Sequence, residues 1–396
     1  MTRVAWIALA CLAGTSVAAS DWSRWRGPDG TGISAESDWR PQALTGAVKA
    51  KWRTNLGLGV CSVSIAGKRL YTLGNVGGSD NVYCLDAETG KLIWRFPYPC
   101  PAGNFYGPRA TPTLDGGLLY TLSRKGDALC LDAENGKVKW AKDLMREFKA
   151  QPTDYGLCGS PLIVGDLVLY NALESGIAFN KLTGEKVWAS AAGPGGYATP
   201  VAFRMKEKDL VAIFGARALH IVEPATGKKL SSFSWQTEFD GNAADPAFYD
   251  EKLFITSGWE RGCALLDVSG TSAKTVWENK NLRGHLSSPI HLNGWIFGID
   301  DNTPNGQLKC LDAKTGEVKW AQKGMFESMS MAGERILALD KKGFLVVAEA
   351  SPKEYKEIAR TPVLNSKARN WTAPVLANGL LYCRNSDGDL VCIDVR

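Results

Sequence analysis

The sequence is poor in the residues that most enzymes use for their chemistry. It has three histidines among 396 residues, and no two of them have the spacing of a zinc site. The Gly-x-Ser-x-Gly motif of hydrolases is absent, and no glycine-rich phosphate loop precedes a helical pattern. These absences leave no recognisable nucleophile, zinc centre or nucleotide site, so the motifs identify no reaction.

Charge of one sign and long apolar runs are also scarce. The 46 Lys and Arg residues and 41 Asp and Glu residues give a formal net charge of +5, and no five basic residues follow one another. A nucleic-acid-binding protein normally carries a concentrated basic patch, so no nucleic-acid partner is predicted. Beyond the N-terminal segment no stretch approaches the roughly 18 apolar residues of a membrane span, so no transmembrane segment is expected in the mature chain.

The N-terminus has the pattern of a secretory signal peptide. Arg3 provides the positive start, residues 4–13 an apolar core, and residues 17–19 a small-residue cleavage site. Cleavage after Ala19 predicts a protein that is periplasmic or secreted. An alternative takes Cys11 as the acylated cysteine of a lipoprotein, but the apolar run before it is short.

Residues 83–94 introduce a pattern that returns down the chain: an alternating strand, an Asp-Ala-x-Thr-Gly turn, and a second strand that ends in tryptophan. The glycine provides the positive φ that the turn needs, and the aspartate can accept hydrogen bonds from the turn amides. One hairpin cannot bury the tryptophan ring, so the units must stack. Close copies occupy residues 129–140 and 309–320, and weaker copies occupy residues 180–188, 223–235 and 266–277.

The tryptophans of this repeat recur at intervals of about 42 to 48 residues, which suits four short strands per unit. A degenerate unit at residues 344–358 carries Ile358 where the tryptophan would stand. The predicted fold is therefore all-β, an eight-bladed β-propeller with tryptophan-docking repeats; the alternative is a seven-bladed ring with one unit outside it. The repeated tryptophans are Trp52, Trp94, Trp140, Trp188, Trp235, Trp277 and Trp320.

The two ends of the repeat region complement each other. Residues 49–56 contain a strand without its hairpin partner, whereas residues 390–396 are the first half of a hairpin without its second half. Pairing of these N- and C-terminal strands closes the ring and removes two exposed sheet edges. The chain then divides into a signal peptide (1–19), an N-terminal arm (20–47) held on the body by Trp22 and Trp25, and the propeller (48–396).

Ten cysteines in an exported chain would ordinarily suggest disulfides. Four of them occupy the same place in four different repeats and should lie in separate sheets, beyond bridging distance. They are expected to be buried, free thiols. A cross-strand disulfide between Cys383 and Cys392 is the exception left open, because a two-residue turn at Asp387 and Gly388 would set them opposite each other.

Each blade also contains an inner strand that begins with a small residue and a proline, which is tolerated at the start of a strand. The polar, glycine-rich loops before these strands converge on one mouth of the central channel. Either their side chains satisfy backbone groups around a water-filled funnel, or they bind a ligand. In the second case tryptophan would stack on the ligand, arginine would bind an anionic group, and histidine would act as acid or base. The candidate ligand-binding residues are Arg109, Tyr155, Tyr197, Asn242, Trp259, His285, Arg369 and Trp371.

The Asp-Ala-x-Thr-Gly-Lys-x-x-Trp units resemble the repeats of the pyrroloquinoline quinone (PQQ) family of propellers, which includes quinoprotein alcohol dehydrogenases and BamB-type outer-membrane assembly lipoproteins. The arm sequence at residues 25–32 further resembles the start of secreted propellers from planctomycete and related bacteria. For the dehydrogenases, the resemblance implies a vicinal Cys-Cys disulfide, a calcium ion and an aspartate base. This chain has no Cys-Cys pair and no Cys-x-x-Cys-His haem motif. Residues 300–302, Asp-Asp-Asn, could supply oxygen ligands to calcium, but a solvated acidic turn is the favoured interpretation.

The sequence therefore predicts an exported, monomeric propeller that acts as a non-catalytic binding or scaffolding protein, with a protein partner or a small polar ligand at the channel mouth. No cofactor and no metal are predicted. One alternative is a PQQ-dependent quinoprotein oxidoreductase with calcium. Another is a saccharide-binding or saccharide-cleaving propeller, in which Arg109 and Trp371 would contact an acidic sugar.

Overall fold

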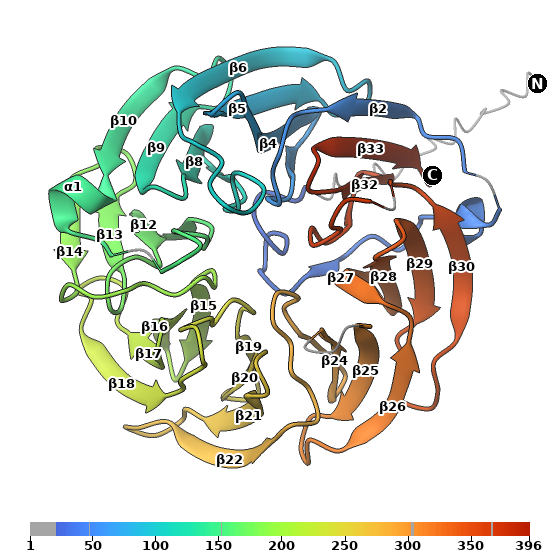
Figure 1. Cartoon of the computed structure of the whole chain (residues 1–396). Coiled ribbons are helices and arrows are strands. Elements are labelled where there is room, and N and C mark those ends of the chain that lie inside the picture. Colours follow the sequence, from blue (N-terminus) through green and yellow to red (C-terminus); the bar gives the residue numbers. More distant parts are fainter. Residues whose placement is uncertain (1–20, 47, 152, 302–304, 366) are drawn as a thin grey trace, which may run out of the picture.

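The structure is a computed structural model that describes residues 21–46, 48–151, 153–301, 305–365 and 367–396. In this part of the chain the strands form eight sheets, seven of four strands and one of five, arranged as blades of a ring (Figure 1). The predicted all-β, eight-bladed propeller is thereby confirmed, and the seven-bladed alternative is wrong. The predicted signal peptide lies outside the described residues.

Each blade has four antiparallel strands that follow one another outward from the centre of the ring, and blade 7 has one further, parallel strand (Figure 1). Blade 1 consists of β3 (Ser64–Ala66), β4 (Arg69–Val76), β5 (Ser79–Asp86) and β6 (Leu92–Pro99). Blade 2 consists of β7 (Thr113–Asp115), β8 (Leu118–Leu122), β9 (Asp127–Asp132) and β10 (Val138–Asp143). Blade 3 consists of β11 (Leu162–Val164), β12 (Leu167–Tyr170), β13 (Ile177–Asn180) and β14 (Lys186–Ala189). Blade 4 consists of β15 (Val201–Met205), β16 (Lys208–Phe214), β17 (Ala218–Val222) and β18 (Lys229–Ser234). Blade 5 consists of β19 (Ala247–Tyr249), β20 (Lys252–Ser257), β21 (Gly262–Asp267) and β22 (Lys274–Asn279). Blade 6 consists of β23 (Ile290–Leu292), β24 (Trp295–Asp300), β25 (Gln307–Asp312) and β26 (Val318–Lys323).

The last two blades include strands from the N-terminal region. Blade 7 adds β1 (Ile33–Ser34) to β27 (Phe326–Ala332), β28 (Arg335–Asp340), β29 (Phe344–Glu349) and β30 (Glu357–Pro362). Blade 8 adds β2 (Trp52–Asn55) to β31 (Val375–Ala377), β32 (Leu380–Arg384) and β33 (Asp389–Asp394). The described helices are η1 (Pro41–Leu44) and α1 (Leu144–Phe148). No helix among the described residues has the length and apolar character to cross a membrane.

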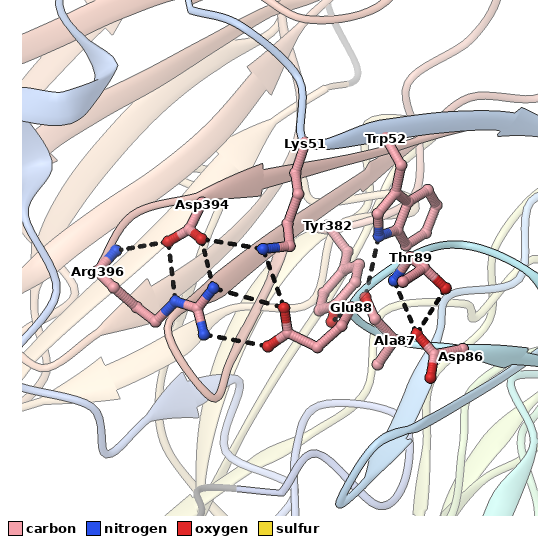
Figure 2. A network of polar contacts seen from close by, with 9 residues as sticks. All are labelled: Lys51, Trp52, Asp86, Ala87, Glu88, Thr89, Tyr382, Asp394 and Arg396. Carbon is pink, nitrogen blue, oxygen red and sulfur yellow. Dashed lines mark hydrogen bonds and ion pairs between the residues drawn. The ribbon is translucent and has the colours of Figure 1, made fainter.

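The ring closes where β2 pairs antiparallel with β33, with Trp52 opposite Cys392, as the sequence predicts. A polar network reinforces this closure (Figure 2). Glu88 of blade 1 accepts Lys51 Nζ at 2.9 Å and Arg396 Nη1 at 3.1 Å, and both cations also pair with Asp394. These groups are partly exposed, and such pairs contribute about 0–1 kcal/mol each. Burial of Trp52 therefore supplies more of the closure energy than the ion pairs.

Six of the repeated tryptophans dock one blade on the next. The Trp52 indole N–H donates to the Ala87 carbonyl at 3.0 Å, and the same bond recurs from Trp94 to Ala133 at 3.1 Å. The turn glycine has two roles here. Gly90 has φ +70°, and a Cβ on it would lie 2.7 Å from the Trp52 ring. Glycine is therefore required both by the turn and by the packed indole. Equivalent indole bonds join Trp140 to Lys181, Trp188 to Pro224, Trp277 to Ala313 and Trp320 to Ser351.

Two of the predicted docking positions are wrong. Trp235 lies beyond the end of β18, is fully buried and donates to Ser257 Oγ at 3.0 Å. Ser231 stands in the docking position of that blade, and its Oγ accepts the Ala273 amide of the next blade at 2.9 Å. In β30 the docking position belongs to Ala359, one residue after the predicted Ile358. A tryptophan a few residues away kept the spacing regular in the first case. In the second case the turn from Glu349 to Lys356 is two residues longer than the turn from Asp86 to Lys91 and lacks its glycine.

The N-terminal arm crosses the centre of the ring, where it appears in blue (Figure 1). Trp22 forms a backbone bridge with Ile65 of blade 1, and β1 pairs in parallel with β27 of blade 7. Further along, Trp39 and Leu44 join the buried cluster that contains Ala359, and η1 packs on β30. The arm thus contributes apolar side chains at one of the two blades that lack a docking tryptophan.

The nine cysteines in the described part of the chain are free. Cys383 lies opposite Val391, and Cys392 lies opposite Tyr382, so the disulfide left open from the sequence does not form. The reason is the turn: Asn385 N donates to the Asp389 carbonyl at 3.1 Å, which makes the loop one residue longer than expected and shifts the register. A one-residue shift moves a side chain to the other face of the sheet.

Candidate functional site

A belt of hydrogen bonds joins the inner strands of neighbouring blades. In five blades the residue before the leading proline accepts a backbone amide of the preceding blade through its side-chain oxygen. This hydrogen bond explains why Ser or Thr recurs at this position, whereas a need for a small residue would not. The bonds run from Ser62 N to Thr111 Oγ1, Thr111 N to Ser160 Oγ, Ser160 N to Thr199 Oγ1, Thr199 N to Asp245 Oδ1, and Asp245 N to Ser288 Oγ, at 2.7 to 3.0 Å.

Asp245 is the acidic member of this belt, and it binds the arm. Its Oδ1 accepts the Thr199 amide at 2.7 Å, and its Oδ2 accepts the indole N–H of Trp25 at 2.6 Å. The neighbouring Arg26 is buried and donates to the Pro289 carbonyl at 2.8 Å. The arm is therefore fixed inside the channel, and Trp25 reaches the space above it.

That space is a funnel of about 660 Å³ at the channel mouth where the inner strands begin. Trp25 and Asp245 lie in its lining. The structure brings seven of the eight sequence-predicted residues to this funnel: Arg109, Tyr155, Tyr197, Trp259, His285, Arg369 and Trp371. Asn242 is the exception. It is fully buried, and its amide donates to the carbonyls of Gly215, Ala216 and Trp235.

Aromatic side chains form much of the funnel wall. The Tyr155 ring lies 5.1 Å from the exposed Phe105 ring and 5.6 Å from the Tyr197 ring, measured between centroids. On another part of the rim, Trp371 packs against Tyr106 with an edge contact at 5.7 Å. Edge and tilted contacts of this kind hold the rings at fixed angles. These parts of the wall are therefore aromatic and largely preorganised.

The two arginines assigned to an anionic group already have protein partners. Arg109 donates from Nη1 to the Gly107 carbonyl at 2.9 Å and from Nη2 to the Phe105 carbonyl at 2.7 Å. Arg369 pairs with Glu327 at 3.4 Å. Burial raises the pKa of Glu327, whereas its hydrogen bond from the Asn370 amide and the charge of Arg369 lower it. An anion would have to compete with these contacts.

Asp301 and His285 meet in the wall beside Trp259. The two Asp301 carboxylate oxygens accept the backbone amides of His285 and Leu286, the latter at 3.0 Å. Removal from water raises the pKa of Asp301 to about 7 and lowers the pKa of His285 to about 4, so His285 is neutral at pH 7. The solvated acidic turn favoured for residues 300–302 is wrong for Asp300, which is buried and paired with Arg283 and Lys309. Asp301 is partly exposed, and its two oxygens accept backbone amides. Asn302 lies outside the described residues.

The comparison with protein families settles the lineage. The family model of the outer membrane protein assembly factor BamB matches residues 28–108 and 101–322, which together make up more than half of the chain. The chain belongs to this family. A search among curated proteins found no match. The resemblance of the arm to planctomycete propellers stays a prediction.

Solved structures agree with the BamB family assignment at the level of the fold. BamB from Moraxella catarrhalis superposes with a TM-score of 0.63 at 17% identity, covering 88% of this chain and 97% of that one. Quinohemoprotein alcohol dehydrogenase from Comamonas testosteroni gives 0.68 at 14% identity, covering 95% and 80%. A europium-containing methanol dehydrogenase gives 0.68 at 12% identity, covering 94% and 89%. At such identities these likenesses show a shared fold, which hosts both assembly factors and dehydrogenases.

The residues of this BamB-family funnel do not fit a calcium-bound quinone. In the part of the chain that the structure describes, no group of three or more His, Cys, Asp or Glu side chains is placed to hold a metal ion. The funnel carboxylates Asp245, Asp301 and Glu327 come from different blades, and each accepts backbone amides. Calcium prefers six to eight oxygen ligands gathered at one point.

Sequence reasoning missed several residues of the funnel. Trp25 was assigned to the arm, and Glu327 and Lys341 lie in segments without a leading proline. Asp245 carried a usable signal, because it is the one acidic residue where other blades have Ser, Thr or Ala before proline. Asp301 carried a weaker signal, since an acidic pair in a turn is usually solvated.

Proposed function

We propose that this BamB-family propeller is an exported, non-catalytic binding protein and that the funnel is its ligand-binding site. The observation that carries the proposal is a funnel of about 660 Å³ walled by aromatic side chains, with Trp25 of the arm in its lining. A concave, mostly apolar site with a few polar groups is the usual form of a ligand pocket. The ligand is a small polar molecule or a short segment of a partner protein, and the protein acts as a monomer.

The arrangement of the titratable groups favours binding over catalysis. His285 is neutral, and desolvation alone accounts for its lowered pKa, so no neighbouring carboxylate tunes it as a base. The funnel arginines are engaged by carbonyls and by Glu327, which disfavours the acidic-saccharide alternative. The funnel carboxylates that could bind calcium come from different blades and form no metal-binding group among the described residues, which disfavours the quinoprotein alternative.

Titration with fluorobenzyl alcohol, followed by fluorine NMR, tests whether the funnel binds ligands. We expect saturable binding that Trp371→Ala weakens, because this ring lines the funnel. The matched control is Trp295→Ala, since Trp295 is also partly exposed but lies outside the funnel. Binding that survives Trp371→Ala as well as it survives Trp295→Ala would contradict the proposed site.

Incubation with PQQ and calcium tests the enzyme alternative. After dialysis we expect no retained quinone absorbance and no dye-linked oxidation of alcohols. A retained quinone together with alcohol oxidation would favour a quinoprotein oxidoreductase over a binding protein.

A further inference from the structure

We infer that the funnel wall formed by Trp259, His285 and Asp301 binds an organic ammonium group, such as a primary amine carried by a ligand or a partner side chain. This inference rests on the proposed function and specifies the chemistry of the ligand. It reverses the expectation from sequence, in which arginines at the mouth were to bind an anion.

Asp301 differs from the other carboxylates of the funnel in its electrostatic partners. Glu327 has Arg369 beside it, and Asp245 lies close to Arg26. The described hydrogen bonds of Asp301 come from the backbone amides of His285 and Leu286. Asp301 is thus a carboxylate in the cavity wall, and none of its described hydrogen-bonding partners is a side-chain cation. A ligand ammonium would provide the charge that the protein does not.

Trp259 and Asp301 line the same funnel, and both contact His285. The Trp259 ring meets the His285 ring at 3.9 Å between centroids, and His285 is hydrogen-bonded to Asp301 through its backbone. A neutral histidine adds no repulsion to a cation. Indole is the aromatic group that attracts cations most strongly, by about 0.5 to 2 kcal/mol depending on desolvation. The wall therefore combines a carboxylate and an indole, which are the two groups that recognise an ammonium.

The turn that carries Trp259 has a left-handed backbone at two residues. Trp259 and Glu260 have φ of 49° and 56° in the turn between β20 and β21, where Asn or Gly is usual. A large side chain held in this region costs about 1–2 kcal/mol. The ring lies over Gly241, where a Cβ would come within 2.2 Å of it. The same left-handed pair occurs at Lys206 and Glu207 and at Asp250 and Glu251, so the particular feature of this turn is the ring packed against Gly241.

An ion-pair network behind the wall holds its members together. Arg283 bridges Glu260 at 2.7 Å and Asp300 at 3.2 Å. Glu260 adjoins Trp259 in sequence, Asp300 adjoins Asp301, and Arg283 lies two residues before His285. The bridge thus fixes the three segments that carry the wall. Lys309 also pairs with Asp300, so the positive charges of Lys309 and Arg283 are directed to Asp300 and Glu260.

Three fluorobenzyl probes of similar size and different charge test the inference by fluorine NMR: the ammonium, the alcohol and the benzoate. We expect the ammonium to bind the intact protein about tenfold more tightly than the benzoate, as a charge-assisted contact predicts. Asp301→Asn should weaken the ammonium about tenfold and leave the alcohol unchanged. Asp245→Asn is not a suitable control because Asp245 holds the arm, so Trp295→Ala serves again.

A pH titration of the unmodified protein gives a second readout that does not depend on a variant folding. Because Asp301 has a pKa of about 7, ammonium affinity should rise from pH 6 to pH 8 while alcohol affinity stays constant. His285, with a pKa of about 4, does not change charge in this range, and the Arg283 guanidinium stays protonated. Glu327 and Asp245 also face the funnel, so the rise must disappear in Asp301→Asn to be assigned to Asp301.

The outcomes separate the two proposals. Equal binding of all three probes, or tightest binding of the benzoate, would overturn the ammonium site and leave the funnel as a binding site. Failure of every probe to bind would overturn the proposed function, and the ammonium site with it. Ammonium preference that Asp301→Asn leaves intact, in a variant with an unchanged circular dichroism spectrum, would also refute the assignment to Asp301.

Discussion

Replacing Trp52 by Ala should open the ring at its closure. Trp52 is 9% exposed, donates to the Ala87 carbonyl at 3.0 Å and lies 6.0 Å from Tyr382 between ring centroids. Loss of a buried tryptophan side chain costs about 3–5 kcal/mol, because both the buried surface and its packing are lost. The loss falls on the contact between blades 8 and 1, where the two chain ends meet. We expect the free energy of unfolding to fall by this amount.

Hydrogen exchange read by mass spectrometry locates the effect. Amides of β2 and β33 should exchange faster in Trp52→Ala, because local opening there no longer breaks a docked indole. Trp94→Ala is the matched control, since Trp94 donates to Ala133 in the same way at 3.1 Å but joins blades 1 and 2. If both variants accelerate exchange at the same places, or if Trp52→Ala leaves β2 and β33 protected, the closure argument is wrong.

Four further predictions concern the structure around the ring. Gly90→Ala should destabilise the protein by more than the roughly 1 kcal/mol of left-handed strain, because the added Cβ meets the docked indole; thermal unfolding measures this. Trp39→Ala should lower the melting temperature more than the surface change Leu182→Ala does, because Trp39 is buried in a core cluster and Leu182 is exposed. Reduction with dithiothreitol should leave the melting temperature unchanged, since the described cysteines are free; a drop would reveal a disulfide. The pKa of Asp394 is lowered chiefly by its bond from Arg396, so its stabilising effect is present near neutral pH and should be lost as acid protonates it; unfolding in a pH series shows whether stability falls on that side.

Prediction from sequence succeeded where a residue type has one dominant structural use. A turn glycine followed at a fixed distance by a tryptophan, repeated along the chain, is compatible with few folds, so the blade count and the pairing of β2 with β33 followed from spacing. Prediction failed where a similar residue stood nearby, as with Trp235, or where the turn was longer and lacked its glycine, as with Ile358. Spacing constrains a position to within a few residues, whereas docking requires one particular residue.

The residues of the candidate site, too, could be predicted from the sequence only in part. Convergence of the leading loops on one mouth follows from the symmetry of a ring, so seven of the predicted residues line the funnel. Asn242 does not, because in sequence a polar side chain that satisfies buried carbonyls looks the same as one that faces a cavity. The presence of Trp25 depends on the path of an arm without repeats, for which the sequence offers no periodicity.

By itself the sequence determined the architecture of this protein, because a repeat forces every copy into equivalent surroundings and the complementary ends leave one way to close. Only the tertiary structure decided the chemistry of the funnel. Contacts formed in the folded chain decide whether Arg109 is free to bind a ligand and whether Asp301 is solvated. They also decide which residue of the arm lies in the funnel. Such contacts are set by packing in three dimensions, and no local pattern of residues encodes them.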